Sequence, residues 1–168
     1  MATSKVQILV GTALKLNGEV GADHAFSMEG VVDNAGRVSI QIDLGASPRP
    51  VAYKWKAEAL MQATPVQGQS INFYMATAPD NDSTMIDGDV GATDAALGDL
   101  DQLRNLTPIG SIAMEEADTT KMVGGGAFTC LDQYLTIVGE NQGGSTINAT
   151  DSNFIFNLEP YDLQGQAT

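Results

Sequence analysis

The side chains that could support nucleophilic catalysis are few in this sequence. His24 is the only histidine and Cys130 the only cysteine, so a Cys–His pair or a serine triad would have to use His24. Cys130 ends an apolar predicted strand, a position where a thiol is usually an inert packing residue. No Gly-x-Ser-x-Gly nucleophile motif is present. We therefore expect a protein that is not an enzyme and has no catalytic residues.

Two acidic stretches could hold a cation or paired carboxylates. Residues 80–89 contain four aspartates, but Met85 and Gly91 stand where an EF-hand needs glycine and glutamate. We predict a solvated loop there, with no bound metal. The second stretch consists of Glu115, Glu116 and Asp118. Paired carboxylates cleave glycosides when they face each other across a cleft, whereas acids gathered at one strand end indicate a charged hairpin. No cofactor-binding motif is present, so no cofactor is expected.

Aromatic side chains separate a predicted core from a predicted contact surface. Tyr53 and Trp55 share the apolar face of one predicted strand, so we assign them to the core and not to a sugar-stacking platform. Tyr74 lies on the face opposite its apolar neighbours, and Tyr161 lies near the end of the chain. With nearby charged residues they define a candidate interaction surface, which consists of Tyr74, Tyr161, Asp87, Asp89 and Arg104.

The charge of the chain argues against two classes of partner. The formal net charge is −13, from 8 basic and 21 acidic residues. Residues 1–56 hold six basic and five acidic residues, whereas residues 57–168 hold two basic and sixteen acidic residues. Such a chain repels phosphate groups, so we expect neither nucleic acid nor a membrane as a partner. We also recognise no signal peptide and no apolar run long enough to span a bilayer.

Alternation of apolar and polar residues with a period of two dominates the sequence. It is clearest in segments 38–44, 51–61, 71–75 and 154–158, and further strands are predicted at 5–16, 25–32, 109–114, 119–130 and 134–140. Segment 134–138 is apolar on both faces, which predicts a central strand. The three glycines at 124–126 predict a bulge or a close approach of two backbones.

Residues 77–107 lack this alternation and are predicted to form a long insertion with one short helix. Leucines recur every three residues within 93–105, which favours a helix there, capped by Thr93 or Asp94. Eight or nine antiparallel strands around one insertion indicate an all-β fold. We predict a single two-sheet β-sandwich domain over residues 1–168, jelly-roll-like in kind, with a meander or an immunoglobulin-like strand order still open.

Several short segments carry a resemblance to a known group of proteins. They include Gly-Arg-Val-Ser at 36–39, Tyr-Lys-Trp-Lys-Ala at 53–57 and Phe-Tyr-Met-Ala-Thr-Ala at 73–78, followed by segments 86–91, 104–106 and 109–112. Over residues 5–160 the chain resembles small structural proteins of tailed bacteriophages. The resemblance implies a jelly-roll-like virion protein, made in the host cytoplasm, that decorates or cements the outer capsid surface. It implies the major capsid protein or other virion proteins as partners, and a homo-oligomer, expected to be a trimer.

Two other functions remain open at this stage. A glycan-binding or tail-associated host-recognition module requires exposed aromatic residues beside polar groups. A carboxylate-based glycosidase requires two acids that face each other across a groove. If the chain is a capsid protein, we expect its near-neutral first third to face the shell and residues 80–101 to face solvent or a neighbouring subunit. Charge reversal at Asp87, Asp89 and Asp94 would then leave capsid binding nearly unchanged.

Overall fold

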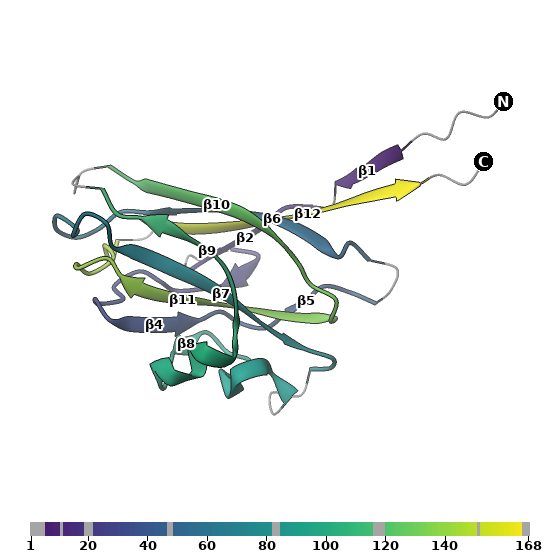
Figure 1. Cartoon of the computed structure of the whole chain (residues 1–168), viewed down its shortest axis with the longest axis horizontal. Helices are drawn as coiled ribbons and strands as arrows, with labels where there is room; N and C mark the ends of the chain where they lie inside the picture. Colours follow the sequence, from purple (N-terminus) through teal and green to yellow (C-terminus); the bar gives the residue numbers. More distant parts are fainter. Residues whose placement is uncertain are drawn as a thin grey trace.

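Two β-sheets packed face to face make up the fold (Figure 1). The computed structural model describes residues 6–10, 12–18, 22–46, 49–81, 85–115, 120–150 and 152–165. Sheet A runs, in spatial order, through β10 (Met122–Thr129), β6 (Ala52–Ala59), β12 (Phe154–Gly165), β2 (Leu14–Asn17) and β3 (His24–Ala25), and β1 (Val6–Val10) also pairs with β12. Sheet B runs through β8 (Ala95–Ala96), β4 (Ala35–Val38), β11 (Tyr134–Gln142), β7 (Ser70–Ala78) and β9 (Thr107–Ala113), and β5 (Ile42–Asp43) also pairs with β11. The predicted all-β sandwich is confirmed.

The strands pair in a nested order along the chain. β2 pairs with β12, β4 and β5 pair with β11, β6 pairs with β10, and β7 pairs with β9, all antiparallel. The chain is therefore a long two-stranded ribbon wound into two sheets, which is the pairing of a jelly roll. This order is neither a meander nor that of an immunoglobulin domain.

The described residues contain twelve strands instead of eight or nine, because two predicted strands are each interrupted and β8 forms within the predicted insertion. The predicted strand 5–16 is split into β1 and β2 opposite Pro160, which has no amide to donate to a ladder. The predicted strand 38–44 is interrupted after Val38. There Ser39 Oγ, instead of a carbonyl, accepts the amide of Ile137 at 3.0 Å. The amide of Ile40 donates to Ala25, and its side chain is exposed, against the prediction that it shares a core face with its neighbours.

Two further predicted elements differ from the structure. In the predicted strand 25–32, pairing ends at Ala25, although Phe26 and Met28 are fully buried. The predicted helix 93–105 is replaced by a shorter 3₁₀ helix, η3 (Leu100–Asn105). Residues 95–96, at the start of the predicted helix, form β8 instead. The cap of η3 is Asp99, whose side chain accepts the amide of Asp101 at 2.9 Å, and not Thr93 or Asp94. A capping box with Gln102 was the local signal for this start.

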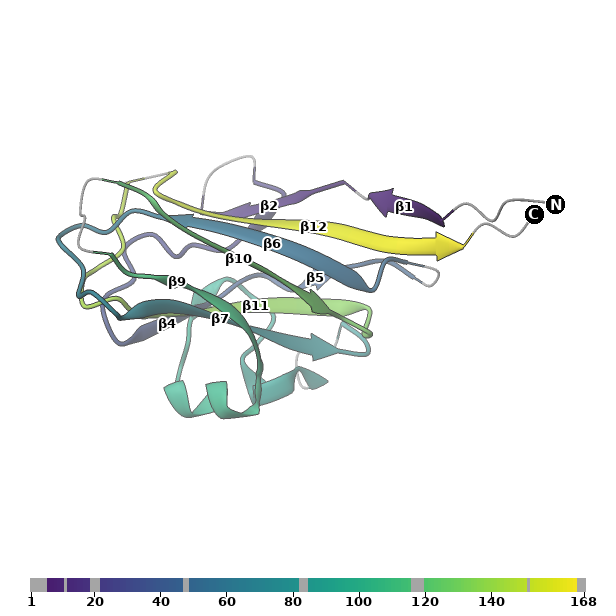
Figure 2. The same cartoon turned by 45° about the horizontal axis from the view of Figure 1, so that its top comes forward.

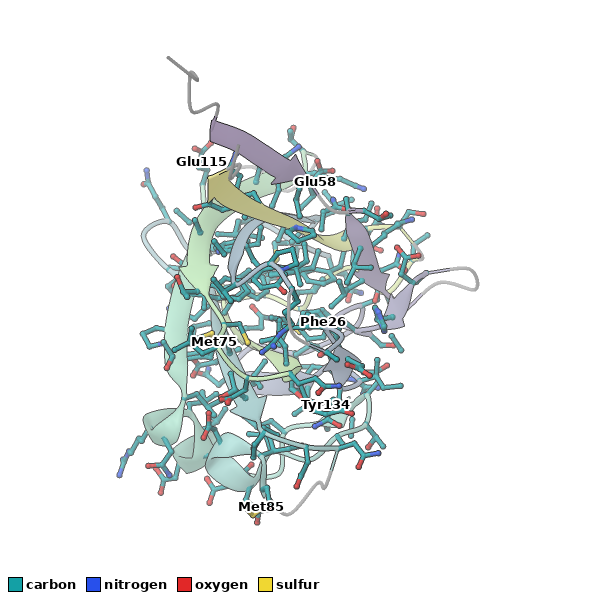
Figure 3. All side chains as sticks on the ribbon, turned by 90° about the vertical axis from the view of Figure 1, so that its right-hand side faces the viewer. Phe26, Glu58, Met75, Met85, Glu115 and Tyr134 are labelled. Atoms are coloured by element: carbon teal, nitrogen blue, oxygen red, sulfur yellow. The ribbon has the colours of Figure 1, made fainter. Side chains whose placement is uncertain are left out.

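The main core lies between the two sheets and is rich in aromatic rings. Trp55 stacks on Phe156 with ring centroids 5.4 Å apart, and Phe73 and Phe154 pack beside them. Figure 3 shows Phe26 between the layers, where it makes edge contacts with two of these rings. The predicted burial of Tyr53 and Trp55 is confirmed, since they are 2% and 3% exposed.

A second apolar cluster lies on the outer face of sheet B. Residues 85–106, called the insertion segment below, fold over this face and include η2 (Asp87–Asp89) and η3. Ile86, Leu103 and Leu106 of this segment pack on Val38 and Val138 of the sheet. The central position predicted for β11 is therefore confirmed, because β11 contacts the main core with one face and the insertion segment with the other.

The glycines at 124–126 allow the edges of the two sheets to converge. A Cβ at Gly124 would lie 2.5 Å from the carbonyl oxygen of Ser111 in β9, and one at Gly126 would lie 2.7 Å from the indole nitrogen of Trp55. The predicted close backbone approach is thus confirmed. The register between β10 and β6 is continuous, and the bulge lies at Ile109 in β9, opposite the step from Phe73 to Tyr74.

Candidate functional site

The fold does not bring His24 and Cys130 together. They lie at opposite edges of sheet A, with β6, β12 and β2 between them, and the usual strand spacing alone separates them by roughly 19 Å across the sheet. Partial burial lowers the pKa of His24, although Asp23 opposes this effect. Burial raises the pKa of Cys130 to about 11, and its Sγ lies 3.4 Å from the carbonyl oxygen of Asp132. This thiol is therefore a protonated packing group at neutral pH.

The acidic stretch 80–89 serves to attach the insertion segment. Asp87 Oδ2 accepts hydrogen bonds from the amide of Thr77 at 3.0 Å and from its hydroxyl at 2.9 Å. Asp87 thereby ties η2 to the end of β7. Across the described residues, no three His, Cys, Asp or Glu side chains gather in a way that could hold a metal ion. Residues 82–84 of this stretch lie outside the described residues.

The second acidic stretch is described only in part. Glu115 is exposed after β9, and Glu116 and Asp118 lie outside the described residues. A depression of about 320 Å³ lies between the ends of β9 and β10, lined by Glu115, Lys121 and apolar or small neighbours. Among the described residues that line this depression, Glu115 is the only carboxylate, and the other charged residue is Lys121.

The five predicted interaction residues do not form one patch. Asp87, Asp89 and Arg104 lie on the insertion segment, outside sheet B, whereas Tyr161 lies on the outer face of sheet A. Arg104 is well exposed and pairs with Asp101 at 3.1 Å. Tyr74 is half-buried on the face that the insertion segment covers, and its hydroxyl donates to Glu140 Oε2 at 3.1 Å. Burial and the neighbouring carboxylate raise the pKa of Tyr74 to about 12.

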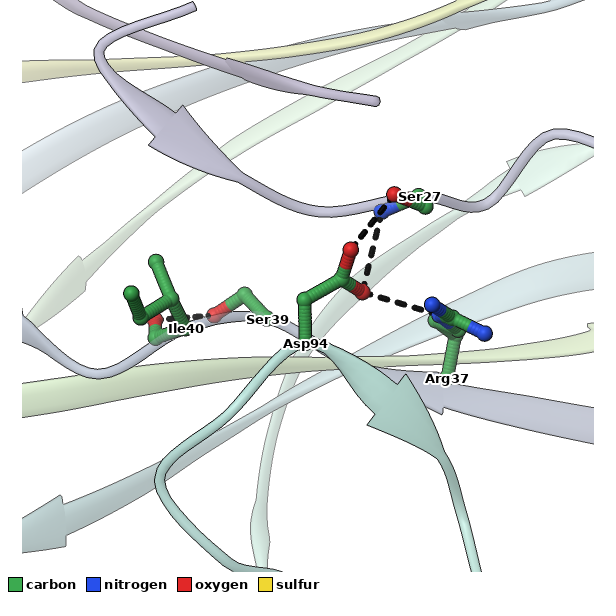
Figure 4. A network of polar contacts seen from close by, with 5 residues as sticks. All are labelled: Ser27, Arg37, Ser39, Ile40 and Asp94. Atoms are coloured by element: carbon green, nitrogen blue, oxygen red, sulfur yellow. Dashed lines mark hydrogen bonds and ion pairs between the residues drawn. The ribbon is translucent and has the colours of Figure 1, made fainter. Parts of the chain in front are cut away.

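Asp94 is a structural anchor and not a free surface charge. Its carboxylate accepts hydrogen bonds from the Arg37 guanidinium at 2.8 Å and from the Ser27 hydroxyl at 2.5 Å and amide at 3.2 Å (Figure 4). Burial by itself would raise the pKa of Asp94, but these hydrogen bonds and the charge of Arg37 hold it below its ordinary value. Asp94 thus joins three segments of the chain. The expectation that Asp94 belongs with the outward-facing charges is wrong.

No described element covers the outer face of sheet A, formed by β10, β6, β12 and β2 (Figure 2). We call it the open face and define it by the outward positions of β10, β6, β12 and β2, except Asn17 of β2, which is fully buried. They are Val123, Gly125, Ala127, Thr129, Ala52, Lys54, Lys56, Glu58, Ile155, Asn157, Glu159, Tyr161 and Lys15. Small residues on β10 keep it flat, and Val123 is 55% exposed.

Local contacts order the charged side chains of the open face. The Lys56 ammonium pairs with Glu58 at 2.8 Å, and this hydrogen bond lowers the pKa of Glu58. The Lys54 ammonium lies 4.9 Å from the ring centroid of Tyr161, within range of a cation–π contact. A shallow depression of about 340 Å³ lies beside Lys54, Asn157 and Glu159. The open face therefore presents positively and negatively charged side chains among small and apolar residues.

The open face and the insertion segment lie on opposite sides of the sandwich. Figure 3 shows Glu58 of the open face and Met85 of the insertion segment at opposite ends of the view, with Phe26 between them. The insertion segment carries five aspartates and one arginine. Alternation in β6 identified Lys54, Lys56 and Glu58 as a wetter face, but nothing local in the sequence shows that this face stays uncovered while the outer face of sheet B does not.

Comparison with models of protein families and with curated proteins finds no match to this chain. Among the described residues, no helix is long and apolar enough to cross a membrane.

Proposed function

We propose that this chain is a structural virion protein of a tailed bacteriophage, a head decoration or cement protein that docks on assembled coat subunits. One observation carries the proposal: no described element covers the outer face of sheet A, whereas the insertion segment covers the middle of the opposite face, over Val38, Val138 and Ala76. Jelly rolls are frequent in viral coats, although the fold by itself does not determine a function. The sequence resemblance points in the same direction. The major capsid protein is the partner that this proposal names.

The size of the open face supports attachment at many repeated sites. Strands about 4.8 Å apart and about 3.3 Å per residue give β10, β6, β12 and β2 a footprint of roughly 500 Å². A stable interface usually buries about 800 Å² on each partner. One such contact is therefore modest. A shell that presents the same site many times, or a decoration protein that binds as an oligomer, would raise the overall affinity.

The charge distribution supports one orientation on the shell. The open face mixes lysines with glutamates, whereas the insertion segment is acidic. The open face would therefore meet the coat, and the insertion segment would face outward. This refines the expected orientation, because the docking face combines β2 and β6 with β10 and β12 from the second half of the chain.

A docking experiment tests the proposal with a matched pair of arginine substitutions. Ala127→Arg places a long charged side chain on the open face, and Asn105→Arg places the same side chain on η3, on the opposite side. Both sites are exposed, so both variants should fold. We expect wild type and Asn105→Arg to co-sediment stoichiometrically with heads stripped of the protein, and Ala127→Arg to lose at least tenfold in affinity. Failure of the wild-type chain to bind, or equal binding of both variants, would contradict the proposal.

A glycan-binding function is the second candidate, and the depression on the open face favours it. Asn157 and Glu159 supply hydrogen-bonding groups there, and Tyr161 presents a ring nearby. Jelly rolls also occur in lectins. Under this alternative, Tyr161→Ala abolishes binding on a glycan array, whereas Tyr74→Ala, on the covered face, leaves it intact. An array without any binder for the wild-type chain would remove this candidate.

A further inference from the structure

A two-stranded ribbon projects from the end of the sandwich (Figures 1 and 2). It consists of β1 and the last part of β12, in a register that runs from Val6 opposite Gly165 to Val10 opposite Tyr161. The pairing of β12 with β6 ends at Tyr161, opposite Ala52. Beyond that point, β1 is the one described strand that pairs with β12, and no described strand pairs with the other edge of β1.

The free edge of β1 in this ribbon can pair with another strand. A strand edge presents a row of backbone N–H and C=O groups, and proteins usually protect an exposed edge with charges, proline or a bulge. β1 reads Val-Gln-Ile-Leu-Val and contains neither a charge nor a proline. Its register with β12 is continuous over five pairs, without a bulge. Two strands alone are marginally stable, whereas sheets of three or more strands are independently stable when a face is buried.

The charge of the chain limits where a second copy could supply the added strand. Two copies, each with a net charge of −13, repel one another over most of their surfaces. β1 is a segment along which they can approach without opposing like charges. An antiparallel contact between β1 and β1 of a second copy is isologous, so it closes on itself after two subunits.

We propose that this chain self-associates through β1, so that two ribbons join into a four-stranded sheet in the order β12–β1–β1–β12. The contact does not require a capsid, so it can be tested on the isolated chain, and its outcome does not depend on whether the proposed function is correct. It yields a twofold pair, whereas the sequence resemblance implies a trimer. On a particle, such a pair would present two open faces at once, which strengthens binding by avidity.

The alternation of backbone groups provides a direct test. In an antiparallel ladder, successive residues direct their N–H groups alternately to one neighbour and to the other. In β1, amides of one parity therefore pair with β12, and amides of the other parity face the free edge. Proline removes one such donor at a time and is tolerated at a free edge. Gln7→Pro and Ile8→Pro are thus a matched pair that remove donors from the two different edges.

The experiment measures mass by sedimentation equilibrium up to about 1 mM chain, a concentration that detects millimolar association. We expect wild type to approach twice the 17.6 kDa of one chain. One proline variant should keep its Tm and lose at least tenfold in dimer affinity, whereas the other should lower Tm. Amide exchange should show that protection of alternate amides in β1 rises with concentration.

Three outcomes would overturn the inference. They are a wild-type chain that stays monomeric at about 1 mM, a dimer that survives both proline substitutions, and a dimer that Ala127→Arg abolishes. The last result would place the contact on the open face instead of on the ribbon.

Discussion

The indole Nε1 of Trp55 donates a hydrogen bond of 3.0 Å to the backbone carbonyl of Ile109 and so connects the two sheets. Trp55 lies on β6 of sheet A, and Ile109 is the bulged residue of β9 in sheet B. The bulge directs the carbonyl of an edge strand toward the core, and the indole supplies the donor that this buried acceptor needs. The contact closes one side of the sandwich, and several measurable consequences depend on it.

Trp55→Phe should lower the free energy of unfolding by about 1–3 kcal/mol, because it leaves the Ile109 carbonyl without its donor. Urea denaturation followed by far-UV circular dichroism measures this change. Lys56→Ala, the next residue on the opposite face of β6, serves as the control and should change stability by less than about 0.5 kcal/mol. Equal effects from both substitutions would show that the hydrogen bond across the sheets contributes nothing to stability.

Gly126→Ala should destabilise the fold by about 1–3 kcal/mol, because the new methyl group overlaps the Trp55 ring. Its Cβ would lie 2.7 Å from Trp55 Nε1 and 3.1 Å from the Ile109 carbonyl oxygen. The fluorescence of Trp55, the only tryptophan in the chain, reports this disturbance directly. Gly98→Ala is the matched control, since the nearest atom to its Cβ would be 3.9 Å away. A Gly126→Ala variant as stable as wild type would rule out a tight approach of β10 to Trp55.

Asp94→Asn should cost about 1–3 kcal/mol at neutral pH, because the hydrogen bonds of Asp94 with Arg37 and Ser27 depend on its charge. The pKa of Asp94 is below its ordinary value of 3.8 in the folded protein. Its contribution to stability is therefore present above about pH 3.8 and is lost as the pH falls through the folded pKa. The difference between wild type and variant should shrink in acid, which thermal unfolding across a pH series measures. Asp101→Asn, at an exposed ion pair, should show neither effect.

Leu106→Ala should loosen the insertion segment more than it loosens the main core. Leu106 is 8% exposed and packs in the second cluster, on the outer face of sheet B. Removal of such a side chain costs about 2–3 kcal/mol. Hydrogen exchange should accelerate in residues 85–106 and stay slow in β6 and β12. Leu100→Ala, at a site that is 37% exposed, is the control. Uniform acceleration through all strands would show that the insertion segment unfolds together with the core.

Cys130 should resist thiol reagents in the folded protein. It is fully buried and its pKa is about 11, so at about pH 8 little thiolate is present. Reaction with a disulfide reagent should therefore proceed only as fast as the chain opens, and should accelerate in denaturant. Thr129→Cys adds an exposed thiol at the adjacent position, and it should react at once while Cys130 remains slow. Rapid native-state labelling of Cys130 would contradict the burial of this thiol.

Part of the fold and little of the candidate site could be predicted from the sequence. The alternation in 51–61 located β6 to within a few residues, because the pattern of a strand repeats every two residues. The segment 134–138, apolar on both faces, located the central strand β11. The breaks at Ser39 and opposite Pro160 could not be predicted in this way. Each depends on a partner strand that lies more than 90 residues away along the chain. For the same reason, Asp94 was grouped with surface charges although it anchors Ser27, 67 residues away.

The sequence by itself determined which segments are extended, which of their faces are apolar and how acidic the chain is, since these properties belong to single residues and their near neighbours. The tertiary structure decided how the strands pair, that the insertion segment covers sheet B and leaves sheet A open, and that β1 extends the molecule as a ribbon. These features arise from contacts between distant segments. Many arrangements of the same amphipathic strands bury a similar apolar area, and specific long-range pairing selects one of them.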